Sequence, residues 1–173
     1  MGQQQLLLLV LGIVIVGLAV VSGIEAFEDN DRRNALDNMA ASAHRVVTDM
    51  IAWRAKPGAL GGGQEASASA PFNNVQLSAL GYNVQEQPTG LGTQRGEWAD
   101  LGGGMWARLG SQASSRPSVT VRNTRQPTIV VEVFLWGPDP NCMVARYGEV
   151  SGRTWTYTIP SSALTQPTGC DGW

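Results

Sequence analysis

Residues 6–24 read LLLLVLGIVIVGLAVVSGI, an unbroken apolar run that contains no charge and has Ser22 as its only polar side chain. A helix rises ~1.5 Å per residue, so a run of this length is about long enough to cross the ~30 Å hydrocarbon core of a bilayer. Such a helix needs an apolar environment. The run therefore predicts burial either in a membrane or in the interior of an assembly of identical helices.

An N-terminal apolar run can also be a secretory signal peptide that is removed. A signal peptide has a basic n-region, a shorter apolar segment and a small-residue cleavage site, whereas the first basic residue of this chain is Arg32. Met1 is then either the initiator or the residue left after a basic leader has been removed. In both cases we expect residues 6–24 to be kept, as a membrane anchor or as a helix of an assembly.

The residues that follow the run can continue the same helix. Glu28 with Arg32 and Asp29 with Arg33 are i,i+4 pairs in the favourable order, and no proline occurs before Pro57 to stop the helix. From residue 36 onward, apolar residues recur at alternating steps of three and four, which is the spacing of one buried helical face. The residues of this face are Leu36, Met39, Ala43, Val46, Met50 and Trp53.

We therefore predict one helix over about residues 1–55 with two unlike halves. Residues 1–27 are apolar almost throughout, whereas residues 28–55 are amphipathic and suited to lie against a globular domain that occupies residues 28–173. Residues 56–116 are glycine-rich and are predicted to be a loop region. Within it, the segment WADLGGGMWARLG could form two short strands around residues 102–104.

A clear strand pattern begins at residue 118. Within residues 128–136, Ile129, Val131, Val133 and Leu135 share one face, which should point at the core. A second hairpin is predicted over residues 142–159, and a loop-like tail over residues 160–173. We predict an antiparallel sheet of three to five strands in residues 117–159, with one face covered by the amphipathic half of the helix, and hence an α+β fold.

The two cysteines, Cys142 and Cys170, both lie in the C-terminal third. A chain with an N-terminal membrane segment can place that third outside the cytoplasm, where disulfides persist. The sequence therefore predicts a disulfide that pins the tail beside residue 142. The alternative is two reduced thiols.

Motifs that carry chemistry are scarce. His44 is the single histidine, and its place beside Arg45 on the amphipathic helix is typical of a solvated residue. The sequence has no zinc-protease motif and no phosphate-binding loop.

Asp139, Glu149 and Asp171 could in principle meet at a calcium ion, but they lack EF-hand spacing. A net charge of -2 gives no electrostatic signature of a nucleic-acid partner. We expect no enzymatic activity, no cofactor and no metal.

The predicted parts of this chain follow one another in a fixed order: an apolar half-helix, an amphipathic half-helix, a loop, an antiparallel sheet and a C-terminal disulfide loop. This architecture resembles the type IV pilin family over the whole chain. The likeness at the level of residues is at the N-terminus, where MGQQQLLLLV looks like the mature end of a pilin with Met1 as the residue left after leader cleavage. Pilins usually have glutamate at the fifth position, where this chain has Gln5. If Gly2 is instead the last leader residue, Leu7 takes the fifth position and the match is lost.

The resemblance implies a structural subunit of an extracellular, type IV pilus-like helical filament, a homo-oligomer of identical subunits. Such subunits wait in the inner membrane, are processed by a leader peptidase, and are moved by an assembly machinery so that residues 1–27 enter the filament core. In the family, the fifth-position carboxylate neutralises the N-terminal amine of a neighbour. Gln5 could accept a hydrogen bond from that amine but brings no charge. The residues assigned to this assembly helix are Met1, Gln5, Leu6, Leu9, Gly12, Val16, Gly17, Val20 and Ile24.

Two other functions fit the same sequence. One is a pseudopilin of a secretion machine, which forms only a short assembly. The other is a single-pass, membrane-anchored extracytoplasmic binding module, whose soluble part would bind a ligand while the full chain stays in the membrane.

Overall fold

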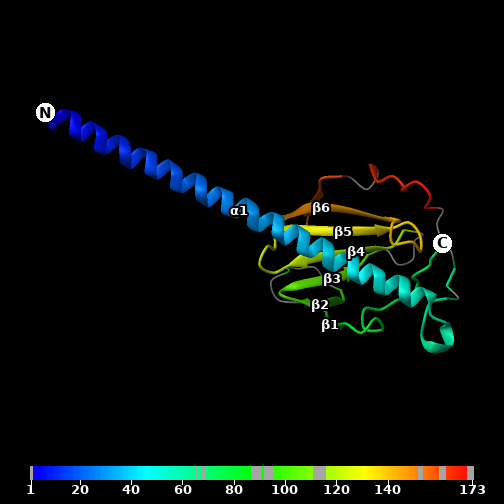
Figure 1. Ribbon diagram of the computed structural model, residues 1–173. Coiled ribbons are helices and arrows are strands. Elements are labelled where there is room, and N and C mark those ends of the chain that lie inside the picture. The colour runs from blue at the N-terminus through cyan, green and yellow to red at the C-terminus, as the bar shows by residue number, and fades with distance from the viewer. Residues whose placement is uncertain are drawn as a thin grey trace. The chain divides into compact units, whose positions relative to one another are not determined.

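The computed structural model describes residues 2–64, 66–67, 69–86, 91, 96–110, 116–151, 154–159 and 163–170. One long helix, α1 (Gly2–Ala55), is followed by a short 3-10 helix, η1 (Gly58–Leu60), and then by strands only (Figure 1). The strands are β1 (Asn83–Gln85), β2 (Trp98–Gly102), β3 (Met105–Leu109), β4 (Ser118–Asn123), β5 (Ile129–Leu135), β6 (Met143–Ser151) and β7 (Thr154–Tyr157).

The seven strands form one sheet in which sequence neighbours are spatial neighbours, in the order β1 to β7, and every pairing is antiparallel. The predicted α+β fold, with a long N-terminal helix packed on an antiparallel sheet, is confirmed. The predicted count of three to five strands is wrong. Strands β1, β2 and β3 all lie within residues 56–116, which were assigned to a loop region. Of these, β2 and β3 fall in the segment for which two short strands were suggested, whereas β1 has only three residues and shows too few alternations to stand out.

The hairpin suggested by WADLGGGMWARLG is present as β2 and β3. Its turn places Gly102, Gly103 and Gly104 at positive φ angles of 83°, 64° and 81°. Three successive residues in this region of φ require glycine, because a Cβ there is strained. The triple glycine is thus a structural requirement of the hairpin.

The chain divides into two compact units, Met1–Ala35 and Leu36–Trp173. The first unit is helix throughout its described residues. The second holds the rest of α1 and the whole sheet. The sequence predicted the boundary between the apolar half of the helix and the globular domain between residues 27 and 28. The difference arises because residues 28–34 are still an exposed, charged stretch of helix, and the face that packs on the sheet starts only at Leu36.

Residues 36–55 of α1 cross one face of the sheet (Figure 1) and form the main core with it. The sheet contributes Ala99, Ala107, Val121 and Val131 to this core, among others, and the segment after η1 adds Phe72, Val75 and Leu77. The predicted core face of β5 is confirmed. Its members Ile129, Val131, Val133 and Leu135 all belong to this cluster.

The opposite face of the sheet is also buried over its central strands. All six residues of β4 are buried, and so are Trp98 of β2 and Val130 of β5, both with no exposed surface. Leu91 and Leu164, from segments outside the strands, are buried as well. Since α1 covers only one face, loop segments cover the other, and the sheet has a core on both sides.

Candidate assembly surfaces

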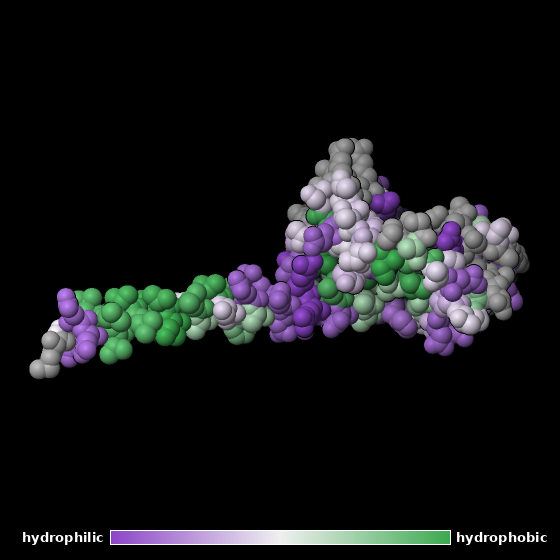
Figure 2. Space-filling model, turned by 90° about the horizontal axis from the view of Figure 1, so that it is seen from above, coloured by the Kyte–Doolittle hydropathy of each residue, from purple (hydrophilic) through white to green (hydrophobic). Residues whose placement is uncertain are grey.

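The apolar half of α1 is exposed along its whole length. Fourteen large apolar side chains between Leu6 and Ile24 each expose 49% or more of their surface. The helix is long and apolar enough to cross a membrane by length and composition, and none of its most apolar window is buried within the chain. Figure 2 shows this part of the helix as a continuous hydrophobic surface.

The structure places the predicted assembly residues on this exposed half. Leu6, Leu9, Val16, Val20 and Ile24 are 55–67% exposed, Gln5 is exposed, and a Cβ on Gly12 or Gly17 would meet nothing within 4 Å. Met1 lies outside the described residues. The polar stretch after Ile24 is exposed too, so within the chain this helix half has no packing partner among the described residues.

The predicted helix-to-sheet residues lie in the main core. Met39, Ala43, Val46 and Met50 have no exposed surface, and Leu36 and Trp53 are partly buried against the same cluster. Fully burying a side chain of this size contributes about 1.5–3 kcal/mol relative to leaving it exposed. The second half of α1 is therefore held by packing, in contrast to the first.

Polar contacts fix the loop that follows the helix. The Tyr82 hydroxyl donates a hydrogen bond to the Asp49 carboxylate on α1. Burial raises the pKa of Tyr82, and the Asp49 carboxylate raises it further. At the end of the helix, the guanidinium of Arg54 donates to the carbonyl oxygens of Gly63 and Ala66.

The predicted disulfide is confirmed. Cys142 and Cys170 are joined with a Cα–Cα distance of 5.6 Å, and both are buried at 4% exposure. The bond ties the C-terminal tail to the residue just before β6. Leu164 and Cys170 of this tail are buried, and neither belongs to the main core on the α1 side of the sheet. The face opposite to α1 is the second face of the sheet.

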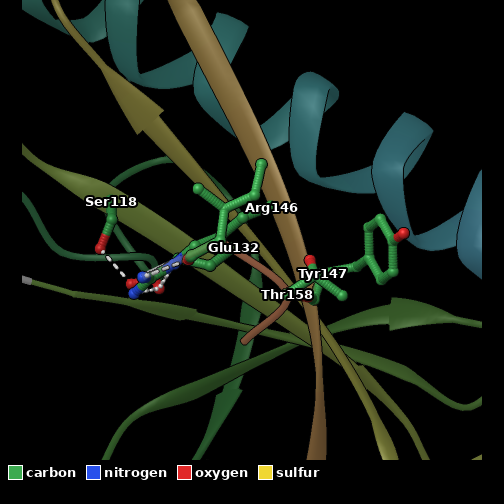
Figure 3. Close-up of polar contacts among 6 residues, drawn as sticks. Ser118, Glu132, Arg146, Tyr147 and Thr158 are labelled. Atoms are coloured by element: carbon green, nitrogen blue, oxygen red, sulfur yellow. Dashed lines mark hydrogen bonds and ion pairs between the residues drawn. The ribbon is translucent and has the colours of Figure 1, made fainter. Parts of the chain in front are cut away.

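Sequence reasoning missed a buried ion pair on that second face. Glu132 of β5 and Arg146 of β6 are cross-strand partners. Their Oε2 and Nη2 atoms are 2.6 Å apart, and their side chains are 12% and 8% exposed. The Ser118 hydroxyl donates to the other carboxylate oxygen at 3.0 Å (Figure 3). The pair is thus held by hydrogen bonds as well as by charge.

Aromatic rings surround the cation of this pair. The guanidinium carbon of Arg146 lies 3.7 Å from the ring centroid of Tyr157 and 4.9 Å from that of Phe134. Burial raises the pKa of Tyr157, and the nearby Glu132 carboxylate raises it further. Charged residues that alternate with apolar ones in a strand normally indicate a solvated face. No local sequence signal shows that this face of the sheet is buried.

A second buried guanidinium lies nearby on the same face. The two Nη atoms of Arg122 donate to the carbonyl oxygens of Leu91 at 2.6 Å and Pro127 at 2.5 Å, and burial lowers its pKa. Arg122 therefore attaches two loop segments to the sheet, which is a structural role.

The described residues contain no catalytic or metal arrangement that can be built up from their contacts. His44 is exposed on α1. In the described part of the chain, no three His, Cys, Asp or Glu residues are grouped to hold a metal ion, and Asp171 of the proposed calcium set lies outside it. Comparisons with protein-family models, with curated proteins and with solved structures found nothing that matches this chain.

Proposed function

We propose that this chain is a structural, non-enzymatic subunit of an extracellular, type IV pilus-like helical filament that assembles from the inner membrane. The observation that carries the proposal is the contrast between the two halves of α1. One half packs a face, from Leu36 onward, into the core of a folded domain, whereas the other half exposes fourteen large apolar side chains.

The size of the exposed apolar surface excludes water as its resting environment. Burial of each such side chain is worth about 1.5–3 kcal/mol, so leaving all of them in water forgoes on the order of 20 kcal/mol. That exceeds the 5–15 kcal/mol or so that stabilises an ordinary folded protein. The helix half must therefore be covered by lipid, by copies of itself, or by each in turn.

A filament subunit uses both environments. Before assembly the helix lies in the bilayer, and afterwards it lies in a bundle of its neighbours. Apolar surface stays buried throughout, so moving from one to the other costs little, and close packing between helices can favour the bundle. Gln5 lies at the start of this half. It can accept a hydrogen bond from a neighbour's N-terminal amine, without the ion pair that a glutamate would add.

The test is electron microscopy of material sheared from cells that express the full chain, compared with a Leu9→Asp, Val16→Asp double variant. An aspartate at the centre of an apolar helix costs about 2.5–3.5 kcal/mol in a membrane. We expect filaments from the wild type and none from the double variant, while the domain of residues 36–173 keeps its disulfide and its tryptophan fluorescence. A Leu9→Ile, Val16→Ile variant is the matched apolar control and should form filaments.

Two results would contradict the proposal. One is intact filaments in the aspartate variant. The other is a wild-type chain found entirely in the membrane fraction, which would favour the membrane-anchored binding module. Short assemblies confined to the cell envelope would favour the pseudopilin.

A further inference from the structure

The globular unit leaves few large apolar side chains in water. Among the described residues of 36–173, the exposed ones are Leu60 at 65%, Tyr147 at 50% and Ile159 at 41%. Leu60 and Tyr147 belong to two sites, one a projecting apolar side chain and the other a cavity, each with an exposed charge beside it, and the two charges are opposite.

Leu60 projects from a turn that is held rigidly against the end of α1. The indole nitrogen of Trp53 donates to the Gly61 carbonyl at 2.9 Å, and the Gly63 amide donates to the Trp53 carbonyl at 3.0 Å. The backbone at Gly63 approaches so closely that a Cβ there would overlap the Trp53 ring. This turn also carries Lys56, which is exposed and is the single lysine of the chain. We call Leu60 with Lys56 the knob.

Tyr147 forms one wall of a shallow cavity of about 230 Å³ on the helix side of the sheet. Its ring leaves the face of β6 opposite to the Arg146–Glu132 pair and points toward α1 (Figure 3). The other lining residues are Leu36, Asp37, Ala40, Val131, Ala145 and Arg146, whose guanidinium is paired with Glu132. The lining is mostly apolar, and Asp37 adds an exposed carboxylate. We call this cavity the socket.

The socket has room for the knob. Its volume of about 230 Å³ exceeds the ~150 Å³ of an enclosed cavity that holds a benzene molecule, so this open depression is large enough for the side chain of Leu60. The charges can pair as well, because the knob carries the ammonium group of Lys56 and the socket carries the carboxylate of Asp37, while Arg146 in the lining is already neutralised by Glu132. The knob is also fixed before contact, so little conformational entropy is lost when it docks.

Knob and socket cannot meet within one molecule. Asp37 and Lys56 lie near opposite ends of the part of α1 that covers the sheet, about 28 Å apart at ~1.5 Å per residue. A contact between them must join two copies through different surfaces on each. Repetition of such a head-to-tail contact gives a ring if it closes and an open helical polymer if it does not.

We infer that Leu60 of one copy docks beside Tyr147 of the next copy, with Lys56 of the first copy facing Asp37 of the second. The inference rests on the proposed function for its occupant, a second copy of this chain. It adds a directional contact between globular units to the packing of the apolar helices.

The first test is a zero-length carbodiimide cross-link on sheared filaments of the full chain. We expect an amide between Lys56 and Asp37, identified by peptide mass spectrometry. A single lysine makes the assignment direct, and the ~28 Å separation within one chain makes the link intermolecular. Lys56→Arg keeps the charge but removes the amine. It should retain filaments and lose the cross-link.

The second test is a charge exchange. Lys56→Asp and Asp37→Lys should each lower the yield of sheared filaments about tenfold, and the two together should restore at least a third of the wild-type yield. Leu60→Ser should lower the yield similarly, whereas Ile159→Ser, at another exposed apolar position, should not. These positions are exposed, so the thermal unfolding of each variant should match that of the wild type. That comparison separates lost assembly from lost folding.

The results separate this contact from the proposed function. Wild-type filaments that give no Lys56–Asp37 link, together with single variants that assemble normally, would overturn the contact and leave the filament function intact. If the wild type forms no filaments, the filament function fails. The contact is then supported by a Lys56–Asp37 link in membranes and overturned by the lack of one.

Discussion

Loss of one partner of the buried Glu132–Arg146 pair should destabilise the globular unit severely. The Glu132→Gln variant keeps the size of the side chain and removes its charge. Arg146 then remains 8% exposed, with one hydrogen bond to the Ile159 carbonyl at 3.2 Å and the two aromatic rings around it, but with no countercharge at 2.6 Å. Arginine cannot lose its proton at ordinary pH, so the cation stays.

The expected cost follows from this geometry. Removing one member of a buried, hydrogen-bonded ion pair typically costs about 3–5 kcal/mol, because an uncompensated charge stays buried. Arg146→Met should cost a similar amount, since it leaves the buried Glu132 carboxylate without its countercharge, with neutral hydroxyl donors such as Ser118 in place of the guanidinium. The Glu132→Gln, Arg146→Met double variant buries no net charge. Its cost should fall short of the sum of the two single costs by about 2 kcal/mol or more.

Urea unfolding of the full chain in detergent micelles, followed by tryptophan fluorescence, measures these free energies. All six tryptophans lie at residue 53 or later, so the signal reports on the globular unit. If the two single effects add to within about 0.5 kcal/mol in the double variant, the pair is not coupled. The reasoning from its burial would then be refuted.

Three further perturbations act on other parts of the same unit. Replacing Cys142 and Cys170 by serine opens a loop with a sequence separation of 28 and should lower the free energy of unfolding by about 3–4 kcal/mol in urea titrations. Met50→Ala removes a fully buried side chain from the helix face and should cost about 2–5 kcal/mol by the same assay. The pKa of Tyr82 is raised in the folded chain, so above about pH 10 the unfolded chain loses this proton first. The free energy of unfolding should then fall by up to about 1.4 kcal/mol per pH unit. Tyr82→Phe removes this titrating group, so the fall in the free energy of unfolding per pH unit should be smaller in this variant than in the wild type.

Each of these has an outcome that would count against the account. Equal stability of the double serine variant under oxidising conditions would show that the tail is held without the disulfide. A cost under about 1 kcal/mol for Met50→Ala would mean that the helix is not packed on the sheet as described. An unchanged alkaline slope for Tyr82→Phe would place the relevant proton on another group.

The helix and its division into unlike halves could be predicted from the sequence, because both depend on local periodicity. The steps of three and four from Leu36 to Trp53 identify the packed face, and the run from Leu6 to Ile24 identifies the exposed one. The face of β5 that joins the core followed from alternation in the same way. These features are all encoded within a few turns or one strand.

The remaining features depend on contacts between residues distant in sequence. Strand β1 has only three residues, and only its pairing with β2 defines it. The second face of the sheet is buried over β4 and β5, so Glu132 and Arg146, which look solvated in a strand pattern, are buried partners. The socket likewise combines residues from α1, β5 and β6, and no single segment indicates it.

The central claim is that residues 6–24 pass from a membrane into the core of a filament of this chain. A cryo-EM reconstruction of filaments sheared from expressing cells tests it most directly. The account predicts a central bundle of helices with residues 6–24 in its interior and the sheet domains outside. Absence of filaments, or a reconstruction with residues 6–24 on the outer surface, would contradict it.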